Sequence, residues 1–137
     1  MKKSVIFICT NNAARSQMAE GYLRAKYSDK YEVYSAGTEP SQINSYSIMS
    51  MKEIGIDISD HASKSLTDFL GMKMDLIVTV CNTAKENCPI FPGGGKSIHK
   101  GFKDPSSIQG TEEEILRVFR EVRDEIISWI ESELVHL

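Results

Sequence analysis

Apolar residues along the chain follow patterns that predict a set of strands. Residues 4–9 and 75–81 are apolar on both faces, as are strands buried inside a parallel sheet. Residues 31–36 alternate between apolar and polar positions and end at Gly37, which predicts another strand between these two. A short further strand is expected near Ile98. The pattern therefore predicts a sheet with at least two fully buried strands.

Apolar positions recur at helical spacing in the segments that follow these strands. We expect helices over residues 16–27, 45–54 and 65–71. The clearest helix closes the chain, because Thr111 to Glu114 match a capping box and apolar residues continue at helical spacing as far as Ile130. Strands and helices that alternate in this order predict an α/β fold, an open parallel sheet with helices on both faces.

The segment between the last buried strand and the closing helix has a different composition. Residues 82–107 contain 3 prolines and 4 glycines, which interrupt both helices and strands. Such a stretch is typical of an irregular loop that serves a function or moves.

Composition narrows the class of protein. The 137 residues are 41% hydrophobic and 26% charged, as in ordinary globular proteins, and we expect one domain spanning residues 1–137. Acidic residues outnumber basic ones by 19 to 16, which argues against a nucleic-acid partner. The apolar runs are too short to cross a membrane, and the N-terminal run is shorter than that of a signal peptide. We expect a cytoplasmic protein without a membrane partner.

The three cysteines are too few for a disulfide scaffold, so each is a candidate for catalysis, metal binding or simple burial. Cys9 and Cys81 each end a predicted strand. If these strands are neighbours, they lie about 4.8 Å apart, close enough for a disulfide after some backbone movement. A zinc site that includes His99 is the alternative, but six residues between Cys81 and Cys88 match structural zinc sites poorly.

The loop after Cys9 has the composition of an oxyanion site. Arg15 and Ser16 stand where the first helix begins. The residues between are Thr10, Asn11, Asn12, Ala13 and Ala14. A short loop that enters a helix presents backbone N–H groups to an anion, and Arg15 adds a forked donor. The same field stabilises a thiolate, so Cys9 is the candidate nucleophile, with the Ser16 hydroxyl donating to its sulfur. The alternative is a buried cysteine and a solvent-exposed arginine.

The stretch from Cys9 to Gly21, CTNNAARSQMAEG, resembles the signature loop of low-molecular-weight protein tyrosine phosphatases. It is still more similar to the thioredoxin-coupled arsenate reductases built on that fold. The resemblance extends to residues 78–81, 87–90, 101–102, 104–105 and 119–126. The family usually has glycine at the position of Asn11, and asparagine tolerates positive φ better than most residues. The resemblance implies a single-domain α/β fold, a four-stranded parallel open sheet flanked by helices.

The resemblance also implies roles for residues outside the loop. In the arsenate reductases three cysteines form a thiol relay, and Cys9, Cys81 and Cys88 match them one by one. Asp104, followed by Pro105, matches the general acid that protonates the leaving oxygen, although an Asp-Pro pair taken alone indicates a turn. Tyrosine phosphatases follow this pair with aromatic residues, whereas this chain has two serines there.

Some of these reductases hold a potassium ion near the loop through an Asn, a Glu, a Ser and an Asp. Asn12, Glu20 and Ser35 match the first three, but Lys64 stands at the position of the Asp. The lysine ammonium either replaces the ion and donates to the same oxygens or is solvated like other surface lysines. We therefore expect no metal here.

The function that these residues imply is the reduction of arsenate to arsenite, with thioredoxin as reductant and no organic cofactor. We expect a monomer that binds arsenate or phosphate. A phosphate monoester hydrolase of the tyrosine phosphatase type is the first alternative, because it needs only Cys9, Arg15 and Asp104. A cysteine-phosphorylated carrier would leave Cys81 and Cys88 unexplained, and a redox sensor would form their disulfide without turnover.

Overall fold

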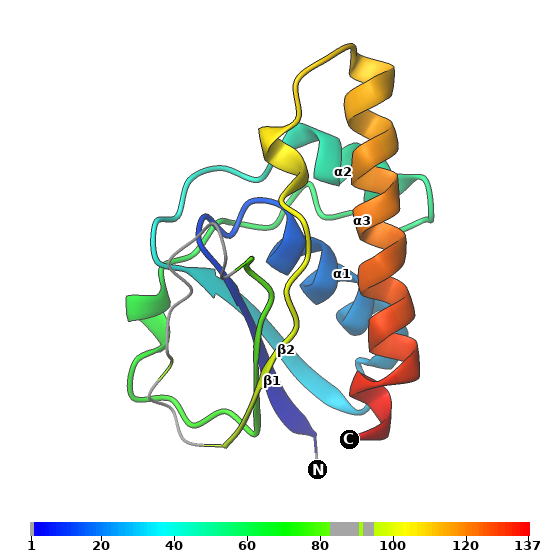
Figure 1. The fold of residues 1–137 in the computed structure, drawn as a ribbon. Helices are drawn as coiled ribbons and strands as arrows, with labels where there is room; N and C mark the ends of the chain where they lie inside the picture. The colour runs from blue at the N-terminus through cyan, green and yellow to red at the C-terminus, as the bar shows by residue number, and fades with distance from the viewer. Residues whose placement is uncertain (1, 83–90, 92–94) are drawn as a thin grey trace.

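A computed structural model describes residues 2–82, 91 and 95–137. Four strands form one parallel sheet in the order β2-β1-β3-β4. Figure 1 labels the neighbouring strands β1 and β2. The strands are β1 (Lys3–Cys9), β2 (Tyr31–Gly37), β3 (Leu76–Thr79) and β4 (Lys96–His99). The predicted parallel sheet is therefore confirmed, and β1 and β3 are neighbours within it.

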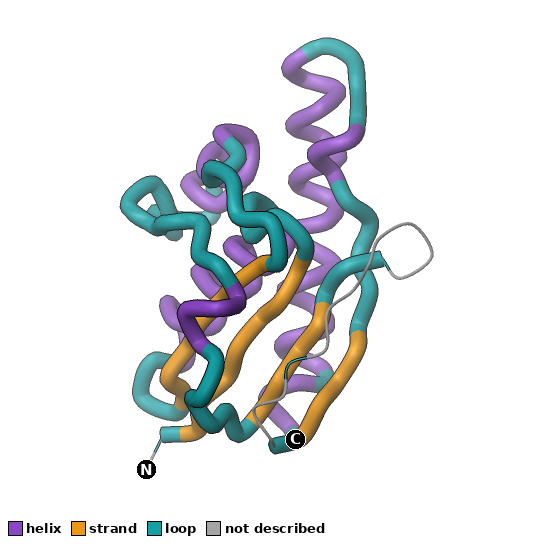
Figure 2. Tube along the Cα trace, turned by 90° about the vertical axis from the view of Figure 1, so that its left-hand side faces the viewer, coloured by secondary structure: helices purple, strands orange, loops and turns teal. Residues whose placement is uncertain are grey.

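The three α-helices that the structure describes cover one face of this sheet (Figure 2). They are α1 (Arg15–Tyr27), α2 (Ser45–Lys52) and α3 (Glu112–Ser132). Val5 of β1 belongs to the same apolar core as Phe119 of α3. The next residue, Ile6, points to the opposite face and belongs to a smaller core with Phe69, which lies in the 3-10 helix η1 (Leu66–Phe69).

Helices were predicted on both faces, and the helix expected over residues 65–71 is present on the second face as the short 3-10 helix η1. Within the described residues, the face opposite the α-helices is covered by η1 and by loop residues. Phe69, Met74 and Phe91 bring large apolar side chains to this face and are at most 8% exposed. These side chains fill the smaller core, so within the described residues this face of the sheet is buried without an α-helix.

The element boundaries agree with the sequence pattern except at a few ends. The capping box of α3 is present, with Thr111 Oγ1 accepting a hydrogen bond from the backbone N–H of Glu114. Helix α2 ends at Lys52, two residues before the expected end, and Gly55 follows in the left-handed region with φ 80°. Two further 3-10 helices are η2 (Pro105–Ser107) and η3 (Leu134–His136).

None of the helices in the described ranges has the length and apolar character of a membrane span.

Gly37 ends β2 beside the loop that follows β1, where Cys9 pairs with it in the sheet. A Cβ atom at this position would overlap the carbonyl oxygen of Thr10 and lie 2.9 Å from the carbonyl oxygen of Cys9 and the nitrogen of Asn12. Only glycine allows the loop to pass this close to β2. The end of β2 therefore fixes the position of the loop.

Candidate active site

The loop between β1 and α1 is held with its carbonyl groups turned outward. Thr10 O accepts from the backbone N–H of Glu39 at 2.9 Å, and Ala13 O accepts from that of Asn44 at 2.9 Å. Asn11 O accepts from the hydroxyl of Ser63 at 2.8 Å. In a trans peptide the C=O and the following N–H point in opposite directions, so these bonds turn the N–H groups of residues 11, 12 and 14 inward. The loop thus has the form of an anion-binding cradle.

Asn12 carries the strained backbone of the cradle, with φ 51°. No other non-glycine residue among those described has positive φ, so Asn11, which replaces the family glycine, needs no unusual conformation. The Asn12 side chain is fully buried. Its Oδ1 accepts from the backbone N–H of Lys64 at 2.8 Å, and its Nδ2 donates to Ser16 Oγ at 2.7 Å. These bonds compensate for the strained turn.

Cys9 lies at the base of the cradle as a free thiol with 2% of its surface exposed. The backbone N–H of Asn12 donates to its sulfur at 3.2 Å, and Ser16 Oγ lies 2.9 Å from the same atom. Because Ser16 Oγ already accepts from Asn12, its own hydrogen is available to the sulfur. Two donors and the start of α1 therefore face Cys9 Sγ, an arrangement that stabilises a thiolate.

Arg15 is 3% exposed and closes the cradle from the side. Its Nη1 donates to the carbonyl oxygen of Phe102 at 3.2 Å, and its Nη2 lies 3.7 Å from Asp104 Oδ2. Phe102 is itself fixed, since its backbone N–H donates to Val80 O at 3.1 Å. The chain after β4 thus brings Asp104 to the mouth of the cradle. The depression there is lined by Cys9, Asn11, Ala13, Ala14, Arg15, Asp104 and Ser106.

Cys81 lies just beyond the end of β3, next to the strand that carries Cys9. The backbone N–H of Val80 donates to Ile8 O at 2.9 Å, which continues the pairing of β1 and β3 up to the two cysteines. Cys81 is buried and disulfide-bonded, and Cys9 is not its partner. The third predicted relay cysteine, Cys88, lies outside the described residues.

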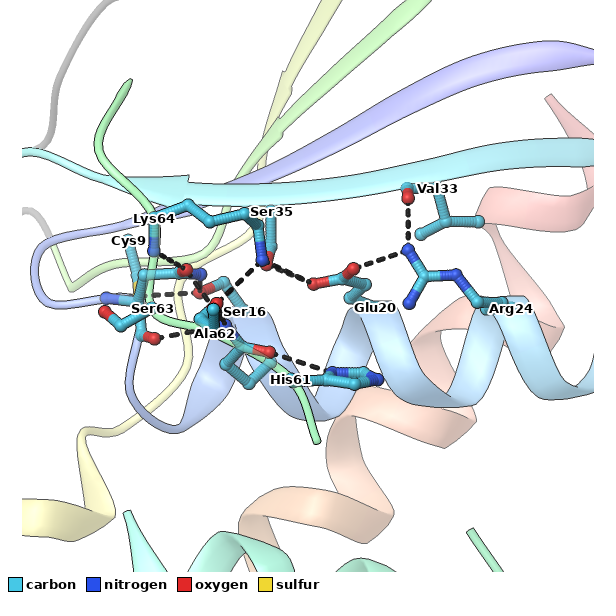
Figure 3. Close-up of polar contacts among 12 residues, drawn as sticks. Cys9, Ser16, Glu20, Arg24, Val33, Ser35, His61, Ala62, Ser63 and Lys64 are labelled. Carbon is cyan, nitrogen blue, oxygen red and sulfur yellow. Dashed lines mark hydrogen bonds and ion pairs between the residues drawn. The ribbon is translucent and has the colours of Figure 1, made fainter. Parts of the chain in front are cut away.

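A buried carboxylate lies behind the cradle, and Figure 3 shows its surroundings. Glu20 is 4% exposed and accepts hydrogen bonds from the Ser35 hydroxyl and from Arg24. Lys64 Nζ lies 3.5 Å from Glu20 Oε1 and donates to the carbonyl oxygen of Ala62 at 2.8 Å. The structure therefore brings Glu20, Ser35 and Lys64 together, while Asn12 binds the backbone of Lys64.

Two polar residues that the sequence analysis did not single out support Asn12. Gln17 is fully buried, and its Nε2 donates to Asn12 Oδ1 at 2.9 Å and to Ala62 O at 2.9 Å. Its Oε1 lies 3.0 Å from His61 Nδ1. Burial lowers the pKa of His61 below the ordinary imidazole value, so the neutral ring is favoured. No sequence signal marks Gln17 and His61, because Gln17 lies 44 residues from His61 and 45 residues from Ala62 along the chain.

The fold and these side chains define a class of protein: an α/β domain with a thiol in an oxyanion-binding loop, faced by an arginine and a carboxyl group. The chain belongs to the low molecular weight phosphotyrosine protein phosphatase family, which matches residues 4–135.

Two relatives that resemble the chain in sequence are arsenate reductases. That of Halalkalibacterium halodurans is 47% identical over 91% of this chain and 90% of its own length. The arsenate reductase of Bacillus subtilis is 45% identical over 90% of this chain and 89% of its own.

Solved structures superimpose on nearly the whole chain. An arsenate reductase in the reduced state gives a TM-score of 0.78 with 31% identity, covering 98% of both chains. The low molecular weight protein tyrosine phosphatase of T. tengcongensis gives 0.76 with 27% identity, covering 99% of this chain and 100% of its own. A thioredoxin-dependent arsenate reductase of Corynebacterium glutamicum gives 0.68 with 27% identity, over 99% of this chain and 64% of its own.

Proposed function

We propose that this protein is an arsenate reductase that converts arsenate to arsenite through a relay of three cysteines. One observation carries the proposal: a free thiol in an oxyanion cradle, Cys9, stands at the end of the strand next to that of a disulfide-bonded cysteine, Cys81. The identity of 45–47% to arsenate reductases supports the same reaction. A hydrolytic phosphatase has no use for the second cysteine.

The first step is the binding of arsenate, whose shape and charge match phosphate. The inward N–H groups of the cradle surround one end of the oxyanion, and Arg15 offers two donors from the side. For Arg15 to bind in this way, its Nη1 exchanges the Phe102 carbonyl oxygen for an arsenate oxygen. Because Arg15 is already buried at the mouth, little of the molecule has to move.

Cys9 then attacks arsenic as a thiolate, and an oxygen of arsenate leaves as water. Ser16 and the N–H of Asn12 hold the sulfur in place, and Asp104 supplies the proton to the leaving oxygen. The product is an arsenic(V)–sulfur bond on Cys9.

The disulfide of Cys81 in the structure corresponds to the oxidised state, so it is reduced before the cycle begins. In the second step the thiolate of the reduced Cys81 attacks the sulfur of Cys9. The arsenic–sulfur bond breaks, its electron pair stays on arsenic, and arsenite leaves. Cys88 then attacks Cys81, which frees Cys9 and forms a disulfide between residues 81 and 88. The two electrons given to arsenic thus come from two thiols, and a dithiol protein of the thioredoxin type restores them. No organic cofactor is needed.

The remaining features fit this role. We propose that Lys64 supplies the positive charge that potassium supplies in some relatives, since its ammonium group faces the buried Glu20. We place the enzyme in the cytoplasm, where a dithiol reductant is available, and expect it to act as a monomer.

The deciding experiment measures arsenate-dependent NADPH consumption with thioredoxin and thioredoxin reductase supplied. NADPH consumption that requires arsenate, thioredoxin and thioredoxin reductase together supports the proposal. Hydrolysis of para-nitrophenyl phosphate with no arsenate turnover would instead support the phosphatase alternative. A single oxidation of the thiols, without arsenate turnover and without hydrolysis, would support a redox sensor.

A further inference from the structure

The two oxygens of the Asp104 carboxylate have different surroundings. Oδ1 accepts two hydrogen bonds from Ser106, one from its backbone N–H at 3.0 Å and one from its hydroxyl at 2.6 Å. Oδ2 faces the cradle, 3.7 Å from Arg15 Nη2. The side chain of Asp104 is one-third exposed, so contacts with the protein decide how its carboxyl group is turned.

The contact with the Ser106 backbone has an ordinary structural purpose. Asp104 is the N-cap of η2, Pro105 occupies the first position of that helix, and a cap needs only the backbone N–H of Ser106. The hydroxyl of Ser106 adds a second donor on the same oxygen. A short bond between a hydroxyl and a carboxylate is stronger than a bond between neutral groups, so this donor restricts rotation of the carboxyl group.

The two bonds also decide where a proton can reside. A protonated carboxyl group carries one O–H, and the oxygen that holds it has less capacity to accept. Because Oδ1 already accepts twice, the proton of a neutral Asp104 belongs on Oδ2. This is the oxygen next to Arg15 at the mouth of the cradle that Cys9 and Ser106 help to line.

We infer that Ser106 is a positioning residue for the general acid: its hydroxyl fixes Oδ1 of Asp104, so that Oδ2 carries the proton and delivers it to the leaving oxygen of the bound oxyanion. The inference rests on the role of Asp104 in the proposed function. It concerns a residue that is not part of the cysteine relay and that need not touch the substrate.

Loss of the Ser106 hydroxyl is expected to slow the chemical step and to leave substrate binding unchanged. General acid catalysis contributes ~10²- to 10⁴-fold, and a carboxyl group that rotates freely loses part of this. We therefore expect Ser106→Ala to lower kcat about 5- to 20-fold with little change in KM for arsenate. Ser106→Thr keeps the hydroxyl and should restore kcat to within about threefold of the wild type.

Ser107→Ala is the matched control. Ser107 lies in the same 3-10 helix, is exposed, and donates from its hydroxyl to the backbone oxygen of Asp104 at 3.1 Å, not to the carboxylate. It should change kcat by less than about twofold. A loss in Ser107→Ala equal to that in Ser106→Ala would mean that the helix as a whole matters, and it would overturn the inference.

The decisive comparison is a double-mutant cycle with Asp104→Asn, which cannot deliver a proton. If Ser106 acts through Asp104, adding Ser106→Ala to Asp104→Asn should not lower kcat further. An equal loss in both backgrounds, or no loss in either, would overturn the inference. Wild-type turnover of arsenate tests the proposed function separately. If only para-nitrophenyl phosphate is turned over, the same cycle measured on that reaction still tests Ser106, because its leaving oxygen also needs a proton.

Discussion

Cys9 and Cys81 lie at the ends of neighbouring parallel strands, and their sulfurs are in different oxidation states. Cys9 is a free thiol hydrogen-bonded within the cradle, whereas Cys81 is disulfide-bonded. Parallel pairing places both residues at the carboxyl-terminal edge of the sheet, where ligands of open α/β folds bind. The strand order alone therefore brings the proposed nucleophile, Cys9, and the second cysteine of the proposed relay, Cys81, to one edge of the sheet.

The first prediction separates the two sulfurs. Cys9→Ser should reduce both arsenate reduction and para-nitrophenyl phosphate hydrolysis to background, because both need the nucleophile. Cys81→Ser should abolish arsenate reduction and leave any hydrolysis within about threefold of the wild type, since hydrolysis ends with water. The NADPH-coupled assay and release of nitrophenol measure the two rates. Full arsenate turnover by Cys81→Ser with thioredoxin would contradict the relay.

The second prediction concerns Gly37, the glycine of β2 against which the cradle loop packs. Gly37→Ala should lower kcat/KM for arsenate about 10²-fold, because a Cβ atom would push Thr10 and Asn12 out of place. It should also cost about 1–3 kcal/mol of unfolding free energy, as overpacked sites do. Urea denaturation and steady-state kinetics provide the two values.

Gly55→Ala is the control for this variant. Gly55 has φ 80°, and a Cβ atom added there would meet nothing within 4 Å, so alanine strains the backbone without touching the cradle. It should cost about 1 kcal/mol of stability and leave kcat/KM unchanged. Equal kinetic losses in the two variants would show that stability, and not the position of the loop, controls activity.

The third prediction concerns the charge behind the cradle. The wild-type melting temperature and turnover should be the same in sodium and potassium salts at equal ionic strength, because Lys64 already faces Glu20. Lys64→Asp should lose about 1–3 kcal/mol in sodium, since two carboxylates then meet in a buried site, and regain part of it in potassium. Lys73→Asp, at an exposed position, should show no potassium effect. A wild-type protein with a much higher melting temperature or turnover in potassium than in sodium would contradict the proposal that Lys64 takes the place of the potassium ion.

The sequence was sufficient to predict the parts of the fold that local patterns determine. The buried strand β1, the start of α1 within one residue of the expected Ser16, and the capping box of α3 each depend on neighbouring residues, and each is confirmed. The covering of the second face was predicted only in part: within the described residues a 3-10 helix and loop residues lie there, because apolar spacing identifies a buried side but not the element that covers it. Phe69 covers this face from η1, which lies within the predicted helix 65–71, and Phe91 covers it from a loop.

The cradle was also predicted from its spacing, but its supports were not. The carbonyl oxygen of Phe102 binds Arg15 across 87 residues, and Gln17 reaches Ala62 across 45. Such contacts depend on the strand order and on loop paths that a single sequence does not encode locally. The strained residue was misplaced for the same reason: the outward bonds of the loop require positive φ at Asn12 and leave Asn11 in an ordinary conformation.

The last prediction concerns pH and the imidazole that supports the cradle. Burial lowers the pKa of His61 in the folded protein, so the unfolded chain binds more protons near the ordinary imidazole value of about 6.5. Stability should therefore be highest above this pH and should fall as pH decreases from there through the folded pKa. Urea denaturation at pH 7.5, 6.5 and 5.5 measures the slope. His61→Gln should flatten it, whereas His136→Gln, at an exposed position, should leave it unchanged. A wild-type protein that gained stability on acidification over this range, with the gain lost in His61→Gln, would mean that the folded state favours the charged ring.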